Sequence, residues 1–312
     1  MVYIKLENNM DKFLEKYQNF PKSMRKIIFK SKCRNGKFIS QKIDGMDYII
    51  LPEVNKNVLK RLSLLANIRC WKNICISNNL MNDKNFCEFL KENSLNLIDG
   101  KWLYKNIVDK IAEYILDINN EKMENQEISI LCNKLDENIL FKIKEMAQKS
   151  KICNILTNNI KQFKKLENEL FKSNGIVLNI STNFKKTLLK SSIIINFDFT
   201  DNYIERCIFS KNAYIINIDK NIKIDKKYWN GKAINSYETN MPNKYLKYKE
   251  IFDGFDNFIL YESFIYKHTN YMNIKKEIEE DNVKIVNLID SNNNIMKKTN
   301  ANLVKRLDKI SI

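Results

Sequence analysis

Two stretches decide the fold: ISILCNKLDENIL, residues 128–140, and KICNILTNN, residues 151–159. Each begins with a short apolar run and passes into a polar loop, and the residues that follow show the apolar spacing of a helix. Continuous apolar runs of this length are typical of strands in a parallel sheet that is covered on both faces. The two stretches therefore predict a β-α-β unit, the repeating element of an α/β domain.

The same alternation continues to about residue 225. Further strands are predicted over 176–181, 192–198 and 214–219, and helices near 136–149 and 160–173. The helix near 160–173 is expected to stop at Asn174-Gly175, because glycine adopts the left-handed conformation that ends many helices. Residues 121–225 are thus predicted to form a Rossmann-like, mostly parallel sheet domain.

A smaller α/β domain, residues 1–120, is expected before it, ending in a long connecting helix. Its strand at 46–52 is followed by a helix that carries Val58, Leu62 and Leu65 on one face. Asn35-Gly36 lies between two partly apolar runs, and Asn-Gly is the strongest short hairpin signal, so a hairpin is predicted there. Residues 226–312 are expected to be a C-terminal extension that packs on the preceding domains and contains a late hairpin after 283–290.

The segments after residue 127 resemble the cofactor domain of shikimate dehydrogenase and glutamyl-tRNA reductase. Ile155-Leu156-Thr157-Asn158-Asn159 is similar to the end of the second strand in those families, and Leu188–Asn196 is similar to a later helix-to-strand element. The resemblance covers about 100 residues and implies a Rossmann-type dinucleotide-binding domain of the NAD(P)-binding superfamily.

The first loop departs from that family. A G-x-G-x-x-G loop normally follows the first strand, because glycine lets the backbone approach the pyrophosphate. This chain has no glycine between Cys132 and Asn138, and Asp136 and Glu137 would lie at the helix N-terminus, where they repel a phosphate. The positions that the resemblance assigns to cofactor binding are Cys132, Asn133, Lys134, Thr157 and Asn158. No catalytic motif of either family matches, so no catalytic residue is assigned.

The chain is basic, with a net charge of +16, and the excess is concentrated near its beginning. Between Glu15 and Asp44 there is no acidic residue. Lysine far outnumbers arginine, which is typical of AT-rich coding, whereas specific nucleic-acid sites rely on arginine for bidentate contacts. Part of the excess charge is therefore attributed to coding bias. The predicted polyanion-binding residues are Lys26, Lys30, Lys32, Arg34 and Lys37, and a solvated basic face is the alternative.

Metal, disulfide and membrane chemistry have no support in the residues. The seven cysteines show no C-x-x-C spacing, which indicates reduced buried thiols and no metal site. A cysteine nucleophile would need a histidine base, and the chain has only His268. No apolar run is long enough to span a bilayer, so a cytoplasmic protein without a membrane partner is expected.

Three hypotheses about function remain open. The first is a Rossmann-like protein with a degenerate phosphate loop that binds a small ligand or a protein partner without catalysis and without a cofactor. The second is nucleic-acid or polyanion binding through the basic N-terminal region. The third is an NADP-dependent oxidoreductase with an aberrant cofactor loop, so whether the protein is an enzyme stays open at this point.

Overall fold

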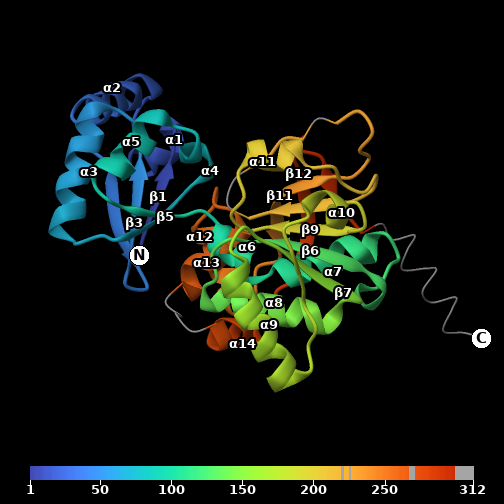
Figure 1. Ribbon diagram of the computed structural model, residues 1–312. Helices are drawn as coiled ribbons and strands as arrows, with labels where there is room; N and C mark the ends of the chain where they lie inside the picture. The colour runs from blue at the N-terminus through green and yellow to red at the C-terminus, as the bar shows by residue number, and fades with distance from the viewer. Residues whose placement is uncertain (219–220, 225, 267–270, 299–312) are drawn as a thin grey trace, which may run out of the picture. The chain divides into compact units, whose positions relative to one another are not determined.

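The computed structural model describes residues 1–218, 221–224, 226–266 and 271–298 (Figure 1). By internal contacts the chain forms two compact units. Unit 1 contains residues 1–100 and 241–266, and unit 2 contains residues 101–240 and the described residues after 270. The division into 1–120, 121–225 and 226–312 stays a prediction about separately folding domains.

Unit 1 is built on a five-stranded sheet in the order β2-β3-β1-β4-β5. β1 runs parallel to β3 and β4, β4 runs parallel to β5, and β2 is antiparallel to β3. Its strands are β1 (Val2–Leu6), β2 (Ile39–Ile43), β3 (Met46–Leu51), β4 (Asn73–Ile76) and β5 (Asn96–Ile98). Its α-helices are α1 (Met10–Phe13), α2 (Lys22–Arg34), α3 (Lys56–Ile68), α4 (Asn78–Met81), α5 (Lys84–Glu92), α12 (Leu246–Ile251) and α13 (Asn257–Ile265).

Alternation along β1 explains why this sheet is covered on both faces. Val2, Ile4 and Leu6 belong to a core cluster that also contains buried residues of α3 and α5. Tyr3 points to the opposite face, because successive side chains of a strand alternate. There its ring stacks on Phe252, with centroids 4.4 Å apart, so residues 241–266 supply the second helical layer of unit 1.

The predicted hairpin at Asn35-Gly36 is wrong. The residues before it form α2, and Gly36 has a φ of 64° just after the end of that helix. Half-buried or buried Ile28, Phe29 and Cys33 recur at helical and not at alternating positions, which is why the segment packs as a helix. The hairpin of unit 1 lies at β2–β3, where Asp44 and Gly45 both have positive φ and form the two-residue turn.

Unit 2 contains an eight-stranded sheet in the order β13-β12-β11-β10-β9-β6-β7-β8. Its strands are β6 (Glu127–Leu131), β7 (Ile152–Leu156), β8 (Asn179–Ser181), β9 (Ile193–Asn196), β10 (Tyr214–Asn217), β11 (Ala233–Thr239), β12 (Ile285–Asp290) and β13 (Ile295–Met296). Its α-helices are α6 (Lys101–Asn106), α7 (Val108–Ile118), α8 (Glu137–Lys149), α9 (Ile160–Asn174), α10 (Phe184–Leu188), α11 (Asp201–Arg206) and α14 (Tyr271–Glu280). Short 3-10 turns cover Glu15–Tyr17, Met123–Asn125 and Asn243–Tyr245 in the two units.

The strands from β6 to β11 are all parallel, and their spatial order is that of a Rossmann fold. Counted from β6, the order across the sheet is 3-2-1-4-5-6, with the topological switch between β6 and β9. The predicted α/β class and Rossmann-like sheet are therefore confirmed. β12 and β13 continue the sheet as the late antiparallel hairpin that the sequence predicted.

Candidate functional site

In a Rossmann fold the ligand site lies beyond the carboxyl ends of the strands at the switch point, here after β6 and β9. The loop after β6 begins at Cys132, and the loop after β9 contains Asp198. Both oxygens of the Asp198 carboxylate accept the backbone N–H of Asn133, at 2.9 and 2.8 Å. One of them also accepts the N–H of Lys134, at 2.8 Å. The amide donors of the first loop therefore bind a carboxylate of the chain itself.

The loop after β7 is tied to the same place. The side-chain oxygen of Asn133 accepts the backbone N–H of Asn158, at 2.9 Å. Thr157 is fully buried, and its hydroxyl accepts the backbone N–H of Asn159. Of the positions predicted to bind a cofactor, Asn133 and Asn158 are thus joined to each other. An acidic residue that would hold a ribose is missing at the end of β7.

The N-terminus of α8 is also occupied by acidic side chains of the chain. Asp136 caps the helix by accepting the N–H of Ile139, at 2.8 Å. Its other carboxylate oxygen lies 2.5 Å from the ammonium group of Lys105. Glu137 follows in the first turn, where its charge complements the helix dipole. The positive end of this helix is therefore neutralised without a bound anion.

Cys132 is a structural thiol at this site. It is fully buried and donates to the carbonyl oxygen of Lys134. Burial, together with the nearby Asp198 carboxylate, raises the pKa of the Cys132 thiol to about 12. Since the thiolate is the nucleophilic form, Cys132 is protonated and unreactive near neutral pH.

These residues do not fit a dinucleotide in the usual position. A pyrophosphate needs free amide donors in the first loop and a close approach of the backbone, which glycine provides. Here the Asn133 and Lys134 amides bind Asp198, and Asp136 occupies the helix end. Sequence reasoning missed the role of Asp198, although an acid directly after the strand that pairs with β6 was the signal available for it.

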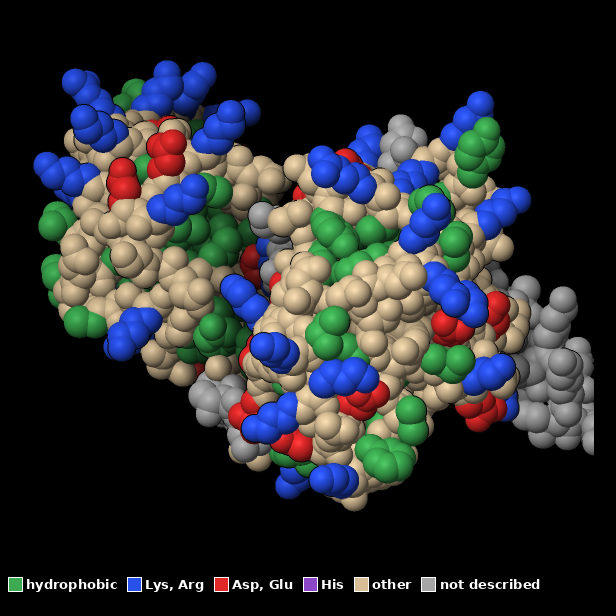
Figure 2. All heavy atoms as spheres, viewed as in Figure 1, with side chains coloured by type: hydrophobic (Ala, Val, Ile, Leu, Met, Phe, Trp, Pro, Cys, Tyr) green, Lys and Arg blue, Asp and Glu red, His purple; other side chains and the backbone are tan. Residues whose placement is uncertain are grey.

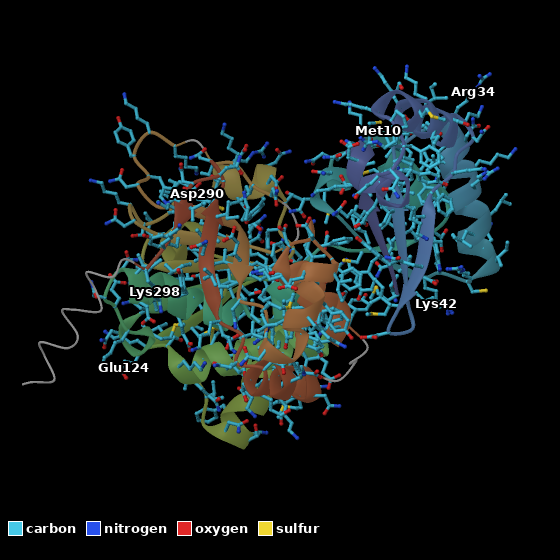
Figure 3. All side chains as sticks on the ribbon, turned by 180° about the vertical axis from the view of Figure 1, so that it is seen from behind. Met10, Arg34, Lys42, Glu124, Asp290 and Lys298 are labelled. Atoms are coloured by element: carbon cyan, nitrogen blue, oxygen red, sulfur yellow. The ribbon has the colours of Figure 1, made fainter. Side chains whose placement is uncertain are left out.

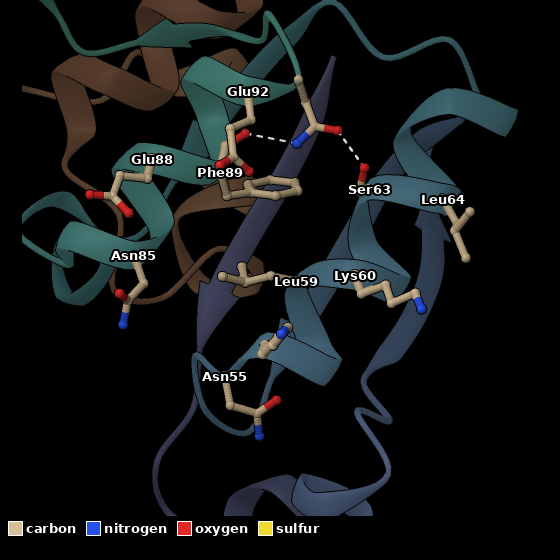
Figure 4. Close-up of a pocket in the computed structure, with 11 residues that line it drawn as sticks. Asn55, Leu59, Lys60, Ser63, Leu64, Asn85, Glu88, Phe89 and Glu92 are labelled. Atoms are coloured by element: carbon tan, nitrogen blue, oxygen red, sulfur yellow. Dashed lines mark hydrogen bonds between the residues drawn. The ribbon is translucent and has the colours of Figure 1, made fainter.

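A concave site lies in unit 1, between α3 and α5 (Figure 4). It has a volume of about 650 Å³, within the range of small-molecule sites. Leu59 and Phe89 supply apolar surface, and the hydrogen bond from Ser63 to Asn93, 2.5 Å long, joins the two helices at one end. Charges of opposite sign line the two sides: Lys56 and Lys60 on α3, and Glu88 and Glu92 on α5.

A second cavity, of about 390 Å³, lies in unit 2. Ser192 and Tyr214, which line it, stand at the amino ends of β9 and β10. It is therefore at the opposite edge of the sheet from the switch-point loops. Most of its other lining residues are polar, among them Asn119, Glu121 and Asn230.

The residues predicted to bind a polyanion do not all share one surface. Lys26, Lys30 and Arg34 are exposed on α2, where Figure 2 shows Lys and Arg side chains gathered. Lys32 faces the other way, and its ammonium lies 4.8 Å from the centre of the Tyr17 ring. Lys37 is exposed after the helix end. Figure 3 shows Arg34 and Lys42 at opposite ends of unit 1, so the acid-free stretch is not one patch.

Within the described ranges, no group of acidic, histidine and cysteine side chains is arranged to hold a metal ion. His268 lies outside the described residues. All seven cysteines are free, five of them buried. None of the helices in the described part of the chain has the length and apolar character needed to cross a membrane.

No protein-family model matches the sequence, and no curated protein matches it. Solved structures with a similar chain course include L-tryptophan dehydrogenase from Nostoc punctiforme, which is 8% identical and has a TM-score of 0.30. The match covers 69% of this chain and 62% of that one, so this chain spans less than two thirds of the length of that protein. D-mandelate dehydrogenase from Rhodotorula graminis is 9% identical over 73% of this chain and 76% of its own, with a TM-score of 0.35. Shikimate 5-dehydrogenase from Listeria monocytogenes is 8% identical over 69% and 77%, with a TM-score of 0.25. The strand order of unit 2, and not these likenesses, assigns the fold.

Proposed function

We propose that this protein is a non-catalytic binding protein whose Rossmann sheet serves as a scaffold and does not hold a dinucleotide. The observation that carries the proposal is the Asp198 carboxylate on the amides of Asn133 and Lys134. A pyrophosphate would have to displace a carboxylate that is part of the chain and always present. It would also meet the negative charge of Asp198 and of Asp136, which repel it.

The ligand is proposed to bind in the groove between α3 and α5. Its volume of about 650 Å³ suits a small ligand, and its floor is apolar at Leu59 and Phe89. Lys60 on one side and Glu92 on the other favour a ligand or peptide segment that carries both signs of charge. The alternative of an NADP-dependent oxidoreductase predicts a site at the switch-point loops instead.

Calorimetric titration of the full chain with NADPH and NADH tests the first half. We expect no saturable heat up to millimolar cofactor. Saturable binding of NADPH that is competed by NADP, accompanied by oxidation of the cofactor with a hydroxy- or keto-acid, would contradict the proposal and favour the oxidoreductase.

Native mass spectrometry of the purified protein tests the second half. A co-purifying small molecule is expected to disappear when Leu59→Trp fills the groove. Val177→Trp, at a position of unit 2 that is 72% exposed, is the control and should leave the bound mass unchanged. A ligand that survives Leu59→Trp would place the binding site elsewhere.

A further inference from the structure

We infer that α2 binds the phosphate backbone of a nucleic acid through a row of four cations, Lys22, Lys26, Lys30 and Arg34, here called the α2 row. The four residues follow one another at intervals of four, so they lie on one side of the helix, about 6 Å apart along its axis. All four are exposed. This inference is independent of the proposed function, because it concerns a different surface.

The α2 row stands on a helix that carries six cations and no acidic residue. On α9, Lys164 pairs with Glu167, and on α14, Lys276 pairs with Glu280. Within the part of the chain that the structure describes, none of the four α2 cations forms an ion pair. Lys22 even stands in the first turn, where the helix dipole disfavours a positive charge. An evenly spaced set of unneutralised cations is complementary to a linear polyanion.

The helix is held firmly enough to present the row as a fixed line. The side-chain amide of Asn55 donates to the carbonyl oxygen of Cys33, at 3.1 Å, and that of Asn57 donates to the carbonyl oxygen of Arg34, at 2.9 Å. These bonds attach the C-terminal end of α2 to the start of α3. The backbone that carries the cations therefore needs little ordering on binding, and the entropic cost of association is confined to the cationic side chains.

The other two cations of α2, Arg25 and Lys32, make contacts within unit 1. The distribution of the remaining cations around the helix favours a nucleic acid over a lipid surface. Arg25 pairs with Asp11, and Lys32 lies over the rings of Phe13 and Tyr17. Met24 and Ile27 are the exposed apolar residues of α2. The cations of the α2 row flank them on one side, and no cation without an internal contact flanks them on the other. A helix that lies in a membrane interface has a broad apolar face flanked by cations, which α2 lacks.

The chemistry of the row predicts phosphate contact without base recognition. Three of its four cations are lysines, which act as point charges, whereas bidentate recognition of guanine depends on arginine. Binding should therefore be independent of sequence and strongly dependent on salt. Four contacts on duplex DNA correspond to a slope of log K against log salt of about −3.6, and on a single strand of about −2.8.

Fluorescence anisotropy of the full chain with a labelled 20-nucleotide duplex, the matching single strand and an RNA of the same sequence tests this inference. We expect one of these slopes for the wild type. Lys26→Gln with Lys30→Gln should reduce the slope by about 1.8 on a duplex or about 1.4 on a single strand, and weaken binding at low salt by at least tenfold. The matched control is Lys161→Gln with Lys165→Gln on α9, a pair with the same spacing, exposure and change of net charge.

Three outcomes would overturn the inference. One is equal binding by the α2 pair variant and the α9 pair variant, which would mean that only net charge matters. Another is the absence of measurable binding to all three nucleic acids at 20 mM salt. The third is α2-dependent binding to vesicles of phosphatidylcholine with 30% phosphatidylserine and no α2-dependent binding to nucleic acid. Circular dichroism melting of each variant checks that the fold is kept, which is expected because all substituted residues are exposed.

Discussion

The carboxylate of Asp198 accepts the backbone N–H of Asn133 with both of its oxygens, at 2.9 and 2.8 Å. The two residues are 65 positions apart and follow neighbouring parallel strands, β6 and β9. Backbone amides in this position of a Rossmann fold form an anion-binding concavity. In this protein the anion is the Asp198 carboxylate of the chain itself, and the amides form a structural contact between the two loops at the switch point.

Asp198→Ala is expected to destabilise unit 2, because two loop amides lose their acceptor. The free energy of unfolding should fall by about 1–3 kcal/mol, the usual range for donors left without their partner. Urea unfolding followed by circular dichroism measures the change. Glu205→Ala, which removes an exposed carboxylate from α11, is the control and should change stability by less than about 0.5 kcal/mol. Equal effects of the two variants would contradict a structural role for Asp198.

The thiol of Cys132 is expected to resist alkylation in the folded protein. Its pKa is raised to about 12, so at pH 8 only about one thiol in ten thousand is ionised. Reactivity should rise only as the pH approaches 12, because the thiolate is the reacting form. Iodoacetamide labelling followed by peptide mass spectrometry should therefore modify the exposed Cys70 and spare Cys132. Early labelling of Cys132 at pH 8 would instead indicate an accessible thiolate at the switch-point loops.

Four of the parallel strands of unit 2, β6, β7, β9 and β10, could be predicted from the sequence because they are short, mostly apolar runs typical of a sheet covered on both faces. β9, with Ile193, Ile194 and Ile195 all buried, is the clearest case. α2 could not be predicted in the same way. Asn35-Gly36 is a signal both for a hairpin and for a helix end, and the helical spacing of Ile28, Phe29 and Cys33 decides between them.

Contacts between residues far apart in the chain could not be predicted from the sequence for a different reason. Residues 241–266 pack on β1 through the contact of Tyr3 with Phe252, and no local pattern specifies a partner about 250 residues away. The contact of Asp198 with Asn133 has the same origin, since it depends on which strands become neighbours in the sheet. The type of fold could therefore be predicted from the sequence, whereas the hydrogen bonds between the switch-point loops depend on tertiary structure.

Phe252→Ala is expected to destabilise unit 1 by about 3–5 kcal/mol, the typical cost of removing a fully buried aromatic ring. Phe252 contacts Tyr3, Tyr48 and Phe255, so the cavity is lined by rings that cannot easily collapse into it. Urea unfolding monitored by tyrosine fluorescence measures the loss. Phe171→Ala, at a position 60% exposed on α9, should be nearly neutral. A small effect at Phe252 would mean that residues 241–266 contribute little to the core of unit 1.

Lys142→Ala is expected to destabilise unit 2 by about 1–3 kcal/mol, because it removes a buried charged donor from Asp109 and Glu145, which keep only the more exposed Lys149 and Lys275 as counter-ions. The Lys142 ammonium lies 2.6 Å from Asp109 and 3.0 Å from Glu145, and the side chain is only 3% exposed. Chemical denaturation at pH 7 measures the loss. Lys164→Ala, which breaks an exposed pair with Glu167, should cost less than about 1 kcal/mol. Comparable losses at the two positions would show that the buried site is open to water.

Gly36→Ala and Gly45→Ala form a matched pair that tests how closely α2 approaches α3. Both glycines have positive φ, 64° and 82°, so each substitution carries a backbone strain of about 1–2 kcal/mol. A Cβ at Gly36 would also lie 2.6 Å from the backbone of Asn57, whereas one at Gly45 meets nothing within 4 Å. We therefore expect Gly36→Ala to cost about 1–3 kcal/mol more than Gly45→Ala, the usual range for overpacking. Urea unfolding of the two variants measures the difference directly, and equal losses would mean that α2 is not held against the start of α3.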